Sequence, residues 1–165
     1  MLHAVTANAQ APMSRIVSFE QDDSGPWVAR LACGHARHVR HQPPFQLAAW
    51  VTSEAGRAAK IGCEMSCQFC RMPALPEGAQ VYKQTATFDA SNVPSGLLAS
   101  HTLKPGTWGR IVVHEGRVAY TLEDEDDFTV VLRPGVAGTI APQRPHHVTP
   151  QPGARFRVEF LRERS

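Results

Sequence analysis

The chain has 165 residues, enough for one domain of ordinary size or two small ones. Its content of 42% hydrophobic and 19% charged residues is typical of a globular protein with a buried core. The net charge of +2 is too small to imply a polyanionic partner. No apolar run reaches the roughly eighteen residues of a membrane span, and residues 1–15 lack the features of an export signal, so we expect a cytoplasmic protein.

The composition changes around "RMPALPEGAQ", residues 71–80, where two prolines and a glycine separate a Cys- and His-rich part from a part without cysteine. We therefore predict two domains, over residues 15–72 and 75–163. All the cysteines lie in the first 70 residues. Without an export signal, this clustering favours metal binding over a disulfide framework.

The first domain is predicted to begin with two strands, "RIVSFEQD" and "WVARLAC", joined by the turn "DDSGP". Residues 53–62 are predicted to form a short helix, with Ser53 as its N-cap and Gly62 as its C-terminal stop.

Short strands and Gly/Pro turns follow in the second domain. "GRIVVHEGRVAYTLE" has the alternation of a hairpin with its turn at Gly116, and "FTVVL" and "ARFRVEFL" are further strands. The fold class is therefore mainly β, a small zinc-binding domain followed by a β-barrel or sandwich.

Two short ligand pairs predict the zinc site. Cys67 and Cys70 have the C-x2-C spacing, and Gly34 allows a tight turn that points Cys33 and His35 at one metal. This pairing resembles the second site of RING fingers, with a longer intervening segment.

Other assignments of the same residues stay open. His38 or His41 could replace His35 as the fourth ligand, and Cys63 is expected to be a bystander thiol. The cysteines could also belong to the core and the histidines to the surface. The nearby arginines have no aromatic stacking row or recognition helix beside them, so we expect a solvated face rather than a nucleic-acid site.

The segment "FEQDDSGPWVARLACGHARHVRHQPP", with "GRAAKIG" and "CQFC" after it, resembles a small bacterial domain family of unknown function. The likeness covers residues 15–71 and rests on a CGH-x2-H-x-RH-x-PP string. It implies no activity, so the zinc prediction depends on the ligand spacing.

Three polar residues stand out among the later strands, His101, His146 and Glu159. Two histidines and a carboxylate inside a small barrel could hold a divalent metal with open positions. Alternatively, Glu159 lies on the surface and the histidines are hydrogen-bonded turn residues.

Residues 75–162 resemble the TehB/YeaR-like domain, a cupin-like domain of bacterial tellurite-resistance and nitrate-responsive proteins. The likeness rests on "VPSGLL", H-x2-K-x-G-x-W and P-x3-H. It implies a pocket that contains His101, Lys104, Trp108, His146 and Glu159.

The H-x-H ligand pair of metal cupins is missing, because Thr102 and Leu103 follow His101. A pocket that binds an anion through Lys104, Arg110 and the histidines is therefore the alternative to a second divalent metal.

Three classes of function follow. The first is a stress-related binding protein, with a zinc-stabilised domain and a pocket for a small or anionic ligand, connected with tellurite or nitrosative stress only through the resemblance. The second is a metal-dependent cupin enzyme, and the third is a zinc-ribbon adaptor for nucleic acid or protein. We expect no membrane partner and leave a homodimer open.

Overall fold

The computed structural model describes residues 12–123 and 127–164. The fold divides between Arg71 and Met72 into two compact units. None of the helices in these described ranges is long and apolar enough to cross a membrane. Most of the segment examined for an export signal, residues 1–11, lies outside the described residues.

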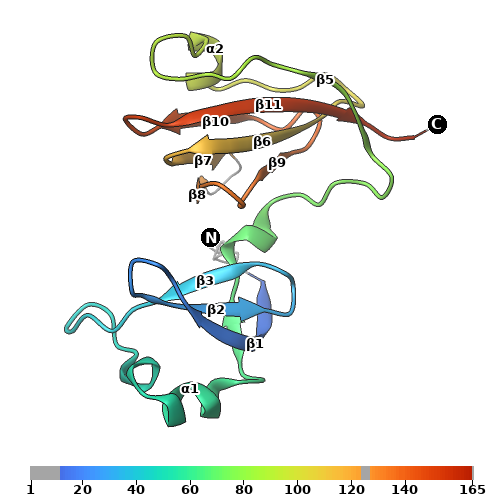
Figure 1. Cartoon of the computed structure of the whole chain (residues 1–165). Helices are drawn as coiled ribbons and strands as arrows, with labels where there is room; N and C mark the ends of the chain where they lie inside the picture. Colours follow the sequence, from blue (N-terminus) through green and yellow to red (C-terminus); the bar gives the residue numbers. More distant parts are fainter. Residues whose placement is uncertain (1–11, 124–126, 165) are drawn as a thin grey trace, which may run out of the picture. The chain divides into compact units, whose positions relative to one another are not determined.

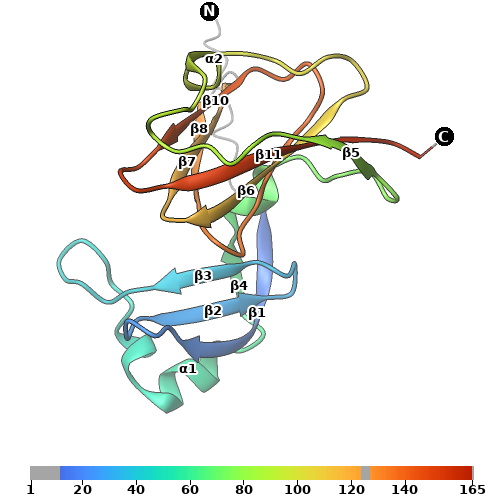
Figure 2. The ribbon, with the colours of Figure 1, turned by 45° about the horizontal axis from the view of Figure 1, so that its top comes forward.

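The first unit is built on an antiparallel sheet with the strand order β3-β2-β1-β4 (Figures 1 and 2). Its strands are β1 (Met13–Gln21), β2 (Trp27–Leu31), β3 (Ala36–Val39) and β4 (Glu64–Ser66). Its helices are η1 (Ala49–Thr52), α1 (Glu54–Lys60) and η2 (Gln68–Arg71). The predicted mainly β fold is thus observed here, with two strands and a short helix close to their predicted positions.

Local hydrogen bonds explain where these elements begin and end. In the turn between β1 and β2, the backbone N–H of Ser24 donates to Asp22 Oδ1 at 2.9 Å. The Ser53 hydroxyl accepts the N–H of Gly56 at 3.0 Å, so Ser53 is the N-cap of α1, as predicted. Helix α1 ends at Lys60, and Gly62 beyond it has a φ of 85°.

The core of the first unit is small. One cluster contains six buried residues, and they are Ile16, Ala29, Leu31, Val39, Val51 and Cys67. A domain with so few buried side chains gains little from hydrophobic burial, so a further source of stability is expected.

The second unit has two antiparallel sheets, with strand orders β10-β7-β8 and β5-β11-β6-β9 (Figure 1). The strands are β5 (Gln80–Gln84), β6 (Trp108–Glu115), β7 (Val118–Leu122), β8 (Phe128–Leu132), β9 (Gly138–Ile140), β10 (His146–Pro150) and β11 (Arg155–Arg162). The short helix α2 (Ser95–Leu98) precedes β6.

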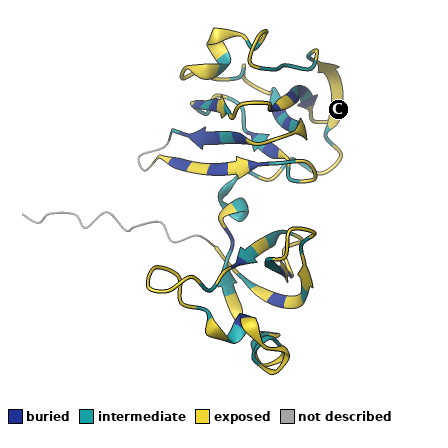
Figure 3. Ribbon diagram, turned by 60° about the vertical axis from the view of Figure 1, so that its left-hand side comes forward, coloured by how far each residue is buried: buried dark blue, intermediate teal, exposed yellow. Residues whose placement is uncertain are grey.

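Contacts between the sheets form the core of this unit. The Tyr120 hydroxyl of β7 donates to the Thr139 carbonyl of β9 at 2.9 Å. A Cβ atom at Gly138 would lie 2.7 Å from Leu132 Cδ1, so the sheets approach too closely there for a side chain. Buried and exposed residues alternate along strands such as β8, which shows that one face of the strand points into this core (Figure 3).

The predicted hairpin over residues 109–123 is wrong in its pairing. Both strands form, but β6 pairs with β11 and β9, whereas β7 pairs with β10 and β8. Gly116, with a φ of 70°, carries the chain from one sheet to the other, and a Cβ atom there would lie 2.9 Å from Ala154 Cα. Alternation predicted the strands, but it could not show which strand lies beside each of them.

Candidate functional site

Two turns of the first unit present the four predicted zinc ligands. Cys33 and His35 lie in the turn between β2 and β3, where Gly34 has a φ of 88°. The backbone N–H of Leu31 donates to the His35 carbonyl at 2.9 Å, which closes this turn. Cys67 immediately precedes η2, and Cys70 lies within it, one helical turn further on.

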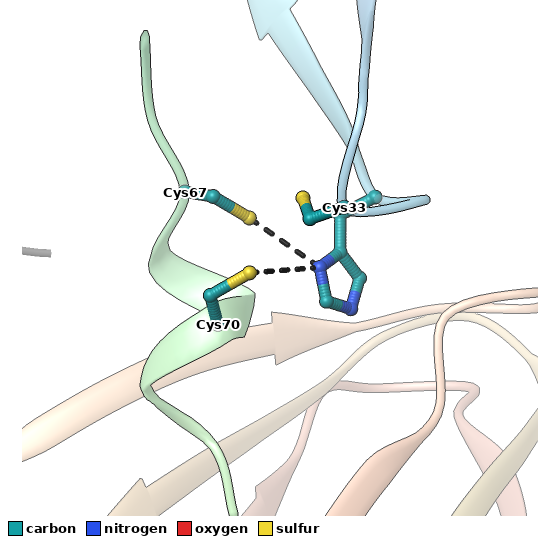
Figure 4. Close-up of side chains that lie close together, drawn as sticks. Cys33, Cys67 and Cys70 are labelled. Carbon is teal, nitrogen blue, oxygen red and sulfur yellow. Dashed lines mark hydrogen bonds between the residues drawn. The ribbon is translucent and has the colours of Figure 1, made fainter. Parts of the chain in front are cut away.

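These side chains converge on one point (Figure 4). Their ligand atoms, three sulfurs and one imidazole nitrogen, all lie within 4.8 Å of one another. Nδ1 of His35 is 3.4 Å from Sγ of Cys67 and 3.4 Å from Sγ of Cys70. In a zinc tetrahedron with Zn–S of about 2.3 Å and Zn–N of about 2.0–2.1 Å, the S···N separation is about 3.6 Å. The arrangement is therefore close to that of a tetrahedral metal site.

The thiols perturb one another strongly. Burial opposes ionisation of Cys33, but hydrogen bonds from Ser14, from the His35 backbone and from the neighbouring side chains lower its pKa to about 6. Burial raises the pKa of Cys67, and burial with the two neighbouring thiols raises the pKa of Cys70 to about 12. Only one thiolate is thus favoured without a cation. A bound divalent metal would lower the pKa of all three thiols, because its positive charge stabilises several thiolates together.

The alternative ligands are engaged elsewhere. Nε2 of His38 lies 2.8 Å from an Asp22 carboxylate oxygen, and Nδ1 of His41 accepts the Ala48 N–H at 3.1 Å. Cys63 is exposed and lies outside the group, with its Sγ 3.8 Å from the Ala59 carbonyl. Among the residues considered as ligands, the geometry thus gathers Cys33, His35, Cys67 and Cys70.

The two histidines of the second unit also meet. His101 and His146 exchange two backbone hydrogen bonds of 3.0 Å, and their ring centroids are 4.1 Å apart. Each ring is held through Nδ1 by a backbone carbonyl, Ala99 for His101 at 2.9 Å and Arg144 for His146 at 2.8 Å. His146 is 1% exposed, and its Nε2 atom is buried with no hydrogen-bond partner among the described residues.

Both histidines line a cavity of about 180 Å³ that includes residues of both sheets. Its remaining lining is apolar, and consists of Leu97, Leu103, Ile111, Ile140, Val148, Val158 and Phe160. The sequence did not predict that these apolar residues line a pocket. The available signal was the alternation of Ile111 and Val158 with polar neighbours along their strands.

The structure does not bring Glu159 to the histidines, so the predicted His-His-Glu set is not assembled. Successive residues of β11 face opposite sides, and Val158 and Phe160 are the ones that line the histidine cavity. Glu159 is buried on the other side, where Nε of Arg110 and Nη2 of Arg157 each donate to it at 2.7 Å. Burial opposes its ionisation, but Arg157 and Arg110 outweigh that effect and hold its pKa below the usual range.

The predicted anion pocket is not assembled either. Arg110 lies opposite Glu159 in the register of β6 and β11 and pairs with it, whereas the next residue, Ile111, lines the histidine cavity. Trp108 is two residues from Arg110 and so lies on the same face of β6. Lys104 is exposed in the preceding loop and does not line the cavity.

Fold and site together define a mainly β chain whose first unit has a Cys3His group that could hold a metal ion. Residues 17–74 match a family model described as a protein of unknown function, DUF3565, and residues 83–158 match the TehB-like domain. The chain therefore carries a match to DUF3565 followed by a match to the TehB-like domain, which confirms both predicted resemblances. The two matched regions are called the DUF3565 domain and the TehB-like domain below.

Two solved structures are similar to part of this chain. A crystal structure of a protein from E. coli strain K12 has a TM-score of 0.52 and 21% identity, over 57% of this chain and 100% of that chain. The crystal structure of TehB from Haemophilus influenzae has a TM-score of 0.49 and 23% identity, over 53% of this chain and 32% of the TehB chain. The similarity thus spans about a third of TehB. A search of curated proteins gives no significant match.

Proposed function

We propose that this protein is a zinc-stabilised binding protein. In this proposal the DUF3565 domain holds one Zn²⁺ through Cys33, His35, Cys67 and Cys70, and the TehB-like domain binds a small molecule between its sheets. The observation that carries the proposal is the convergence of four ligand atoms within 4.8 Å of one another.

The donor set favours zinc and a structural role. Thiolates with one imidazole suit Zn²⁺ better than the oxygen-preferring Mg²⁺ or Ca²⁺. Four protein ligands complete a tetrahedron, which leaves no position for water or substrate. The metal therefore supplies folding free energy to a domain with a small core, and the ligand-binding role belongs to the second domain.

A metal-dependent enzyme is less well supported. Its three predicted ligands do not all meet, since Glu159 is paired with arginines on the opposite side of β11 from the cavity that the two histidines line. Within residues 12–123 and 127–164, the Cys3His group is the one set of three or more His, Cys, Asp or Glu residues close enough to hold an ion.

A nucleic-acid adaptor is also less well supported, because two of the arginines near the predicted zinc ligands already bind other side chains or backbone groups of the chain. Arg30 pairs with Glu20, and Arg37 donates to the carbonyl and hydroxyl of Ser66 at 3.0 and 2.7 Å. The resemblance to tellurite-resistance and nitrate-responsive proteins suggests a cytoplasmic stress response as the setting. Growth of a strain without this protein on tellurite or nitrite would test that setting.

Elemental analysis of the full chain, purified without added metal, tests the proposal. We expect about one zinc per chain, with Cys33, Cys67 and Cys70 protected from a thiol reagent until a chelator is added. The exposed Cys63 thiol should react at once and serves as an internal reference. Protein without zinc, in which all four thiols react at the same rate, would refute the site.

A further inference from the structure

The starting point is the buried Nε2 atom of His146, which has no hydrogen-bond partner within residues 12–123 and 127–164. Nδ1 lies 2.8 Å from the Arg144 carbonyl, which can only accept, so Nδ1 carries the proton and Nε2 is an acceptor. Burial lowers the pKa of His146, which keeps the ring neutral near pH 7. A buried acceptor without a donor is unfavourable, so a group that donates to this nitrogen would be stabilising.

His101 cannot be that donor in its neutral form. Its Nδ1 faces the Ala99 carbonyl at 2.9 Å and therefore also carries the proton, which leaves Nε2 as a second acceptor. The rings lie 4.1 Å apart, between centroids, with two lone pairs and no ring proton to share. The histidine pair, which helps to line the cavity, thus has two acceptor nitrogens and no ring N–H free to donate to them.

The surroundings of the pair favour a neutral ligand. Seven apolar side chains complete the cavity lining. The two cations predicted for an anion site are not there, because Arg110 pairs with Glu159 outside the cavity and Lys104 is exposed in the loop. An anion would therefore lose its hydration without gaining a counter-charge.

The volume limits the size of the ligand. The cavity has about 180 Å³, and an apolar cavity of about 150 Å³ in another protein is known to hold benzene. A molecule with a single ring, of about six to nine non-hydrogen atoms, would fill this space.

We propose that this cavity binds a small neutral molecule of about the size of one aromatic ring, which donates a hydrogen bond from a hydroxyl or N–H group to Nε2 of His146. The inference rests on the proposed function of the TehB-like domain as a small-molecule binder and specifies the chemical class of its ligand.

Three probes of similar size test which kind of ligand the cavity prefers. Phenol has a hydrogen-bond donor, toluene has none, and benzoate is an anion. Each is titrated into the zinc-loaded full chain, and binding is followed by the amide NMR signals of the cavity strands. We expect phenol to bind about tenfold more tightly than toluene, the effect of one hydrogen bond, and benzoate to bind more weakly than phenol.

Matched variants assign the effect to one nitrogen. His146→Leu should reduce the preference for phenol over toluene to about one. His147→Leu should leave it unchanged, because that ring faces Glu123 at 2.7 Å and does not line the cavity. The comparison of the three probes on the unaltered protein needs no variant, so it remains decisive if His146→Leu does not fold.

Equal binding of phenol and toluene, or tighter binding of benzoate, would overturn this inference while leaving a small-molecule binding domain in place. If none of the three probes binds up to its solubility limit, the inference and the small-molecule part of the proposed function both fail. The zinc site is judged separately, by metal content.

Discussion

Replacement of Cys67 by serine tests the proposed zinc site most directly. Cys67 is 2% exposed, belongs to the core cluster of the first domain, and supplies one of the four converging ligand atoms. A serine hydroxyl is a poor zinc ligand at neutral pH, so Cys67→Ser should release the metal and leave a small polar gap in the core.

The expected loss of stability exceeds what the domain can tolerate. Structural zinc contributes about 10–16 kcal/mol in zinc-finger peptides at pH 7. A domain of about 60 residues, at roughly 0.05–0.15 kcal/mol per residue, has a total stability of about 3–9 kcal/mol. With six buried residues in its core cluster, the first domain should therefore unfold without zinc.

Metal analysis and amide NMR spectra measure the outcome. In Cys67→Ser, zinc should fall from about one per chain to near zero, and the signals of residues 12–71 should lose their dispersion. The signals of the TehB-like domain should remain dispersed, because its core lies between its own two sheets. Cys63→Ser is the matched control, since this thiol is exposed and outside the ligand group, and it should keep both zinc and fold.

The reasoning is refuted if Cys67→Ser retains about one zinc per chain, or if the metal-free first domain keeps its dispersed spectrum. The first result would mean that the four-ligand assignment is wrong. The second would mean that the apolar core is sufficient and the metal is not structural.

Three further predictions follow from the same structure. His35→Ala should lower the zinc content, whereas His38→Ala, which removes a ring paired with Asp22, should not, and equal losses in metal analysis would reject His35 as the fourth ligand. Burial lowers the folded-state pKa of His146 below 6.5, so the free energy of unfolding that is present above pH 6.5 should be lost as the pH falls toward the folded pKa. Urea unfolding of the TehB-like domain at several pH values should show this decline. A decline that persists unchanged in His146→Leu would contradict the assignment to His146. Glu159→Gln leaves two arginines without their carboxylate and should destabilise this domain by about 1–3 kcal/mol in urea unfolding, which an unchanged midpoint would disprove.

The Cys3His group was largely predictable because the spacing within each of its two pairs is local. One residue lies between Cys33 and His35, and two lie between Cys67 and Cys70. Each pair can therefore bind a single ion independently of the rest of the fold. Strand positions were predictable for a similar reason, since alternation of apolar and polar residues is a property of a single strand. Neither the ligand spacing nor the alternation predicts the sheet order that brings the two pairs together.

The pocket of the second domain depended on the tertiary structure. Alternation placed Glu159 on the opposite face from Val158 and Phe160, but only the packed sheets showed which face of β11 lines the cavity. The turn at Gly116 has the local pattern of a hairpin, yet it joins strands of different sheets. The physical reason is the same in both cases. A strand presents two faces and two edges that its own sequence makes almost equivalent, and distant strands decide which of them becomes the interior.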